Sequence, residues 1–158
     1  MSKVDFNNEI IDEIKNFISA NNNKKLKETL KDIHYADIAE LIDNLNIDEA
    51  TYLIKLLESD TTADALAEID DEKREKILKN LSTKEIAEEL TELDTDDAVD
   101  IISELPEERK ERVISQIEDD KHIEDIRELL TYDENTAGGL MAKELVKVNE
   151  NLSVLKCL

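Results

Sequence analysis

An aliphatic pair recurs every twelve residues along most of the chain. Its first member stands at eight consecutive positions without a gap, and its second member follows three residues later each time. Residues three apart lie on one face of a helix, so the pattern predicts a series of short helices with buried aliphatic stripes. The first members are Ile42, Ile54, Leu66, Leu78, Leu90, Ile102, Ile114 and Ile126, and the second are Leu45, Leu57, Ile69, Leu81, Leu93, Leu105, Ile117 and Leu129.

Residues that favour helix starts stand between these units. Asp70, Ser82 and Asp94 each follow the last aliphatic residue of a unit, and each can cap the next helix. Ser82 and Glu85 have the spacing of a capping box. Pro106 suits the first turn of a helix, where its missing N–H is not needed. The boundaries between helices are therefore predicted with the same period as the aliphatic pairs.

The repeat predicts an all-α array. We expect eight helices of nine or ten residues over residues 36–131, joined by turns of two or three residues, and two earlier helices at about 5–20 and 24–33. Helices this short are not stable alone, so each must bury its stripe against neighbours. A unit of two helices repeats every 24 residues, which is typical of a solenoid. The chain has 158 residues with only two Gly and one Pro, which leaves little material for β-hairpins.

The charge of the chain excludes several classes of partner. It has 41 acidic against 20 basic residues, a net charge of −21. Such a surface repels nucleic acid and anionic lipid, and it suits cations or basic partners. A single cysteine, Cys157, excludes an internal disulfide framework and fits a reducing compartment. No apolar run reaches the roughly 18 residues needed to cross a membrane.

Nothing in the sequence indicates catalysis. There is no glycine-rich dinucleotide motif and no P-loop, and the serine, histidine and aspartate residues show no triad arrangement. His34 and His122 have no cysteine or second histidine at a spacing typical of a metal site. We therefore expect no enzyme activity and no bound cofactor other than a cation.

The pattern changes after residue 131. Residues 132–141 contain both glycines and are typical of a turn-rich connection. Residues 145–148 favour a strand, and 149–153 favour a turn into a further helix. A strand without a partner strand is not a stable unit, so a second, truncated domain is expected to begin near Met141. The expected organisation is a helical domain at 1–131, a linker at 132–143 and the start of the second domain at 144–158.

Acidic residues are densest at 94–100. If Asp94 caps a helix, Asp96 and Asp100 lie four residues apart on one face of its first turns. Magnesium prefers oxygen ligands and usually takes one or two carboxylates with several waters. A solvated acidic helix face has the same sequence pattern, so both interpretations stay open. Asp97, Glu88 and Glu89 are interpreted as solvated charges.

Three stretches resemble the MgtE-type magnesium transporters. These are residues 33–41, the repeats including 103–108, and residues 136–141, which are similar to the family's linker into its first CBS domain. The resemblance implies the cytosolic N-terminal domain of such a transporter, a right-handed superhelix of about ten short helices. In the family this domain is followed by two CBS domains and a transmembrane pore. Tyr35 departs from the family pattern, in which proline is usual.

The resemblance also implies a function and a ligand set. Asp96, Asp100 and Asp64 correspond to acidic positions that share regulatory Mg2+ with the CBS domains, although glutamate is usual at the position of Asp64. The implied role is magnesium-dependent gating, with the chain on the cytoplasmic side of the cell membrane and the full-length protein a homodimer. Because the ligands are shared, this chain alone is expected to bind magnesium weakly.

Two alternatives fit the same repeats. An acidic array similar to armadillo repeats or flagellar motor switch domains would bind a basic protein on its curved face. A soluble protein with this domain and CBS domains, but no pore, is the other alternative. The domains encoded after Leu158 distinguish all three.

Overall fold

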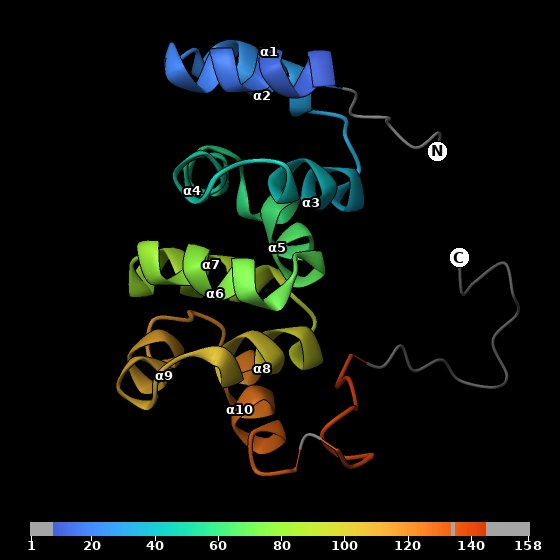
Figure 1. The fold of residues 1–158 in the computed structure, drawn as a ribbon. Helices are drawn as coiled ribbons and strands as arrows, with labels where there is room; N and C mark the ends of the chain where they lie inside the picture. The colour runs from blue at the N-terminus through green and yellow to red at the C-terminus, as the bar shows by residue number, and fades with distance from the viewer. Residues whose placement is uncertain (1–7, 134, 145–158) are drawn as a thin grey trace, which may run out of the picture.

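The computed structural model describes residues 8–133 and 135–144, and over these ranges it is entirely helical (Figure 1). The all-α prediction is confirmed, with eight helices in the repeat region and two before it. The predicted strand at 145–148, the turn after it and Cys157 lie outside the described residues. The helices are α1 (Asn8–Ser19), α2 (Asn23–Leu30), α3 (Tyr35–Asp43), α4 (Ile47–Leu56), α5 (Ser59–Glu68), α6 (Asp71–Asn80), α7 (Thr83–Glu92), α8 (Thr95–Glu104), α9 (Glu107–Ile114) and α10 (Asp120–Leu129).

From α4 to α8 each period of twelve is a ten-residue helix followed by a two-residue connection, whereas α3 and α9 are shorter and the connections after them are longer. After α6, for example, Leu81 has an extended backbone with φ −90° and ψ 148°, and Ser82 caps α7. The second aliphatic residue of this pair therefore lies just past the helix end, not on the helix face as the spacing predicted. The extended residue turns the chain while its side chain stays in the core, where Leu81 is 4% exposed.

Each helix of the array packs mainly on the helix two places along the chain. α3 contacts α5, α5 contacts α7, and α7 contacts α9, while α4 contacts α6 and α8 contacts α10. The result is an elongated stack with the α1–α2 pair at one end and α10 at the other (Figure 1). All eight first members of the aliphatic pairs are at most 2% exposed, and among the second members only Leu57 is partly exposed. The predicted core is thus confirmed. No helix in the described ranges combines the length and apolar character of a membrane span.

The predicted caps are confirmed for two helices. The side chain of Asp70 accepts from the Glu72 N–H, and Ser82 forms a capping box with Glu85. Pro106 lies at the N-cap position of α9, one residue before the first turn in which it was expected. Asp94 has the N-cap position of α8, but its side chain makes no capping hydrogen bond. The first N–H groups of α8 are therefore not satisfied by the side chain of its N-cap residue.

A buried arginine joins three helices, α5, α6 and α8. Arg74 of α6 is 7% exposed and donates to the carbonyls of Ala67 (2.8 Å) and Ile69 (3.0 Å) at the end of α5. Its Nε donates to both carboxylate oxygens of Glu104 on α8, at 3.0 and 3.1 Å, and its Nη2 pairs with Asp71 and Glu104. Basic groups stabilise helix C-termini because the terminal carbonyls lack intrahelical donors.

Arg74→Ala is expected to lower the free energy of unfolding by about 3 kcal/mol or more, because it leaves a partly buried carboxylate and several carbonyls unpaired. Urea denaturation followed by circular dichroism measures the change. Arg127→Ala is the control, since Arg127 and Glu111 form an ion pair whose side chains are 50% and 70% exposed. Exposed pairs contribute less than about 1 kcal/mol. Equal losses in the two variants would contradict the role given to Arg74.

One carboxyl group that was interpreted as solvated is buried. Glu89 of α7 is 5% exposed and accepts a 2.7 Å hydrogen bond from the Thr62 hydroxyl of α5. Its position in the α5–α7 contact outweighs the polarity that predicted exposure. Burial raises the pKa of Glu89 to about 7, and the charges of Glu88 and Glu92 act in the same direction. The folded chain therefore favours the protonated form of this group.

A raised pKa means that the contribution of Glu89 to stability is present below about pH 4.5 and is lost as the pH rises through about 7. Glu89→Gln removes this dependence. The variant is expected to exceed the wild-type chain in unfolding free energy by about 3 kcal/mol at pH 8 and by less than about 1 kcal/mol at pH 5. Urea denaturation at both pH values measures the difference. Glu88→Gln is the control, and a pH-independent difference for Glu89→Gln would refute the assignment.

Candidate functional site

Three carboxylates meet at the N-terminus of α8. One carboxylate oxygen from each of Asp94, Asp96 and Glu144 lies within 4.8 Å of the others. Asp94 and Glu144 are exposed, and Asp96 is partly buried. Asp94 and Asp96 flank the first residue of the helix, whereas Glu144 comes from the segment after α10. The fold therefore adds to the predicted acidic stretch a residue that lies 48 positions beyond Asp96.

Hydrogen bonds to Thr95 hold Glu144 at this place. The Thr95 N–H donates to Glu144 Oε1 at 3.1 Å, and the Thr95 hydroxyl donates to Oε2 at 3.0 Å. Thr95 has no exposed surface. A carboxylate is well suited to a helix N-terminus, because the N–H groups there lack acceptors and carry partial positive charge. Glu144 thus accepts from the first N–H of α8, a donor that the side chain of an N-cap residue does not normally pair with.

The electrostatics of the cluster are those of close like charges. The pKa of Asp94 is raised, first by burial and then by the carboxylates of Glu144, Asp96 and Asp64. The pKa of Asp97 is also raised, again by burial first and then by Asp96 and its other acidic neighbours. Both shifts show that further negative charge at this end of α8 is unfavourable in the folded chain. A bound cation would relieve that repulsion.

The spacing of the three carboxylates fits a small divalent cation. Magnesium lies about 2.1 Å from its oxygen ligands, so two oxygens on opposite sides of the ion are about 4.2 Å apart. The separations between the three carboxylates, all within 4.8 Å, are of this order. Exposed positions also leave room for the water molecules that magnesium retains. Asp94, Asp96 and Glu144 are therefore the described residues best placed to hold such an ion together.

The three residues predicted from the sequence lie in different places. Asp96 belongs to the cluster, whereas Asp100 lines a separate cavity one turn further along α8. Asp64 is exposed on α5, and its charge acts on Asp94 and Asp97. The structure therefore brings one predicted ligand together with Asp94, which was interpreted as a helix cap, and with Glu144, which the sequence analysis did not single out. No spacing rule could have found Glu144, because its approach depends on the path of the chain after α10.

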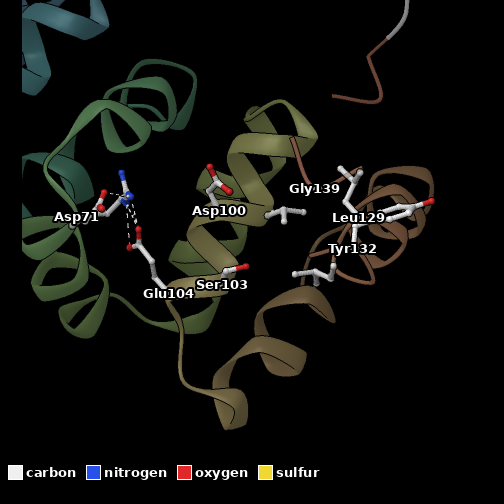
Figure 2. Close-up of a pocket in the computed structure, with 10 residues that line it drawn as sticks. Asp71, Asp100, Ser103, Glu104, Leu129, Tyr132 and Gly139 are labelled. Carbon is white, nitrogen blue, oxygen red and sulfur yellow. Dashed lines mark hydrogen bonds and ion pairs between the residues drawn. The ribbon is translucent and has the colours of Figure 1, made fainter. Parts of the chain in front are cut away.

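The cavity beside Asp100 is the second feature of this surface. It has a volume of about 420 Å3 and lies between α6, α8 and the end of α10, as Figure 2 shows. Val99 and Leu129 form apolar parts of its wall, and Asp100 and Glu104 provide carboxylates. Arg74 lines it as well, joined to Glu104 and Asp71 by the contacts dashed in Figure 2. The arginine is already fully engaged by these partners and by the carbonyls of α5.

Comparisons with known proteins agree with this fold. A crystal structure of the soluble part of a magnesium transporter matches with a TM-score of 0.75 and 23% identity, over 86% of this chain and 54% of that chain. A crystal structure of the cytosolic domain of the Mg2+ channel MgtE in complex with ATP matches with a TM-score of 0.72 and 26% identity, over 84% and 54%. This chain thus spans about half the length of either one. No curated protein matches the sequence.

The family is established by a sequence match. The family described as the MgtE intracellular N domain matches residues 33–135, which is more than half of the chain. The match begins just before α3 and ends after α10, so it contains all eight repeat helices and both acidic positions Asp96 and Asp100. The chain belongs to the MgtE intracellular N domain family.

Proposed function

We propose that this chain is the magnesium-sensing regulatory domain of a magnesium transporter, on the cytoplasmic side of the membrane. The observation that carries the proposal is the group of three carboxylates at the N-terminus of α8, whose oxygens lie within 4.8 Å of one another. Membership of the MgtE intracellular N domain family gives the cluster its context. Magnesium is the ion that this context and the oxygen ligands favour.

Asp96 is the central ligand in this proposal. It is in the cluster, and it is partly buried, so its charge is less screened by water than that of a fully exposed group. Asp100 and Asp64 are further ligands in the proposal, each able to share an ion with a second acidic surface. Asp94 and Glu144 add charge next to Asp96. A site of this kind binds weakly in isolation, because part of the coordination comes from another domain.

The mechanism is neutralisation of like charges between two domains. The acidic face of this chain and an acidic face of the CBS domains repel each other when no cation is bound. Each close pair of unit charges contributes about 1 to 4 kcal/mol, depending on the local dielectric. Magnesium between the faces converts repulsion into attraction, and the closed arrangement disfavours opening of the pore. Falling magnesium separates the domains and permits transport.

The proposal predicts weak magnesium binding that depends on Asp96. Titration of this chain with magnesium chloride, followed by NMR shifts of the backbone amides of 94–100 against sodium chloride at equal ionic strength, measures it. Asp96→Ala is expected to weaken binding about fivefold or more, since a lost ligand charge contributes about 1 kcal/mol or more. Asp100→Ala and Asp64→Ala are expected to have smaller effects in this chain and larger ones when the CBS domains are present.

Glu118→Ala is the matched control, because Glu118 is exposed and follows α9. Tight binding of one magnesium ion that Asp96→Ala does not change would contradict the proposal. Shifts that sodium chloride reproduces would contradict it as well, because they would reflect general screening of an acidic surface.

A basic protein partner is the second candidate. The observations that favour it are the net charge of −21 and the cavity beside Asp100, which combines apolar walls with carboxylates. The stem of an arginine or lysine side chain would pack on Val99 and Leu129, with its cationic head near Asp100. A gene that encodes CBS domains and membrane helices after this chain supports magnesium sensing, whereas a gene that encodes neither supports this alternative.

A further inference from the structure

The segment that leaves the helical array returns to it at α8. Lys143 N–H donates to the Thr95 hydroxyl oxygen at 3.0 Å, and the Glu144 carboxylate accepts from the Thr95 N–H and hydroxyl. Lys143 Nζ pairs with Glu128 of α10 at 2.7 Å. Residues 141–144, called the strap below, are therefore attached to α8 and α10 at once. Met141 also packs partly against the core.

The N-terminus of α8 differs from that of α7. In α7 the side chain of Ser82, directly before the helix, accepts from the Glu85 N–H. In α8 the side chain of Asp94 makes no capping bond, and Glu144, 49 residues beyond Thr95, accepts from the Thr95 N–H, which is the first of the helix. The Thr95 N–H belongs to the first turn, where no intrahelical acceptor exists. Docking of the strap therefore satisfies a buried donor that nothing else in the described ranges is seen to satisfy.

The same docking places like charges side by side. Glu144 sits within 4.8 Å of carboxylate oxygens of Asp94 and Asp96. Like charges this close repel each other, and they repel more strongly where water does not separate them. The hydrogen bonds from the Thr95 N–H and hydroxyl act in the opposite direction, because they satisfy polar groups that have no exposed surface. Opposing contributions of this kind make the contact reversible.

We propose that the strap is a reversible latch, held on the N-terminus of α8 by Glu144 and weakened by the negative charges of Asp94 and Asp96. When docked, it fixes the direction in which the chain leaves the helical array. When released, it frees residues 141–144 and exposes Thr95. The latch stands on the hydrogen bonds to Thr95 and does not require a bound ion.

The latch couples the proposed magnesium site to residues 141–144. A cation on Asp96 lowers the negative charge next to Glu144, so it strengthens docking of the strap. By reciprocity, a docked strap strengthens cation binding by the same factor. This consequence rests on the proposed function, whereas the latch itself does not.

Amide hydrogen exchange of Thr95 and Lys143 tests the latch in magnesium-free buffer with EDTA. Both N–H groups donate only across the contact, so their protection reports docking directly. Glu144→Ala is expected to speed exchange at both amides about fivefold or more, which corresponds to the loss of one helix cap. Glu124→Ala, at an exposed glutamate of α10, is the control and is expected to change neither amide.

The variant Asp96→Asn distinguishes a latch at α8 from a general effect of the acidic surface on amide exchange. It removes the opposing charge and keeps the side-chain shape, so exchange at Thr95 and Lys143 is expected to slow about twofold or more. Glu144 and Asp96 thus have opposite effects although both are acidic. Fast, unprotected exchange of both amides in the wild-type chain would overturn the proposal. So would an unchanged or faster rate in Asp96→Asn.

The same exchange measurement with magnesium chloride in place of sodium chloride, at equal ionic strength, distinguishes failure of the latch from failure of the proposed function. Slower exchange in the wild-type chain, but not in Asp96→Asn, supports both. If the variants behave as expected in EDTA and magnesium has no effect, the latch stands and magnesium sensing at Asp96 is wrong. If magnesium binds through Asp96 but Glu144→Ala leaves both amides unchanged, the latch alone is wrong.

Discussion

Burial of aliphatic side chains between a helix and the one two places along the chain is the interaction on which the structure depends. A ten-residue helix does not persist in water, so no element of this chain forms without its neighbours. Each repeat meets this requirement by burying one aliphatic residue near the helix end, such as Leu78, and one in the extended connection, such as Leu81. Since both are fixed in the core, the start of the next helix is fixed too.

That geometry determines where charge collects. Where the connection has two residues, the residue before the next helix is held next to the core, and acidic residues in the first turn of that helix gain from its dipole. In α8 several carboxylates share this gain, and burial, followed by the charges of these neighbours, raises the pKa values of Asp94 and Asp97. Arg74, the basic residue among the buried side chains of the described ranges, is engaged elsewhere by Glu104 and by the carbonyls of α5. The α8 terminus therefore has negative charge with little internal compensation.

The sequence predicts the periodic helices and the contacts between neighbouring residues, but it does not predict contacts between residues far apart in the chain. The twelve-residue period predicted the number and approximate length of the repeat helices, and Ser82 with Glu85 predicted a cap, because both follow from neighbouring residues. The spacing could not show that Leu81 lies outside the helix, since an extended residue and a last helical residue are buried alike. Glu89 was misjudged because its burial depends on Thr62 of another helix. Glu144 was missed for the same reason, across a longer separation.

α8 connects the strap at its N-terminus with the buried Arg74 contacts at its C-terminus. Its first residue, Thr95, holds the strap, and its last, Glu104, holds Arg74 and through it α5 and α6. Asp96 lies one residue after Thr95, so a change of charge there acts first on the contact that directs the outgoing chain. Because α8 also packs on α10, and Lys143 of the strap pairs with Glu128 of α10, release of the strap loosens two contacts of one packed unit. A rigid helix with a reversible contact at its charged end can therefore convert a change in local charge into a change of chain direction.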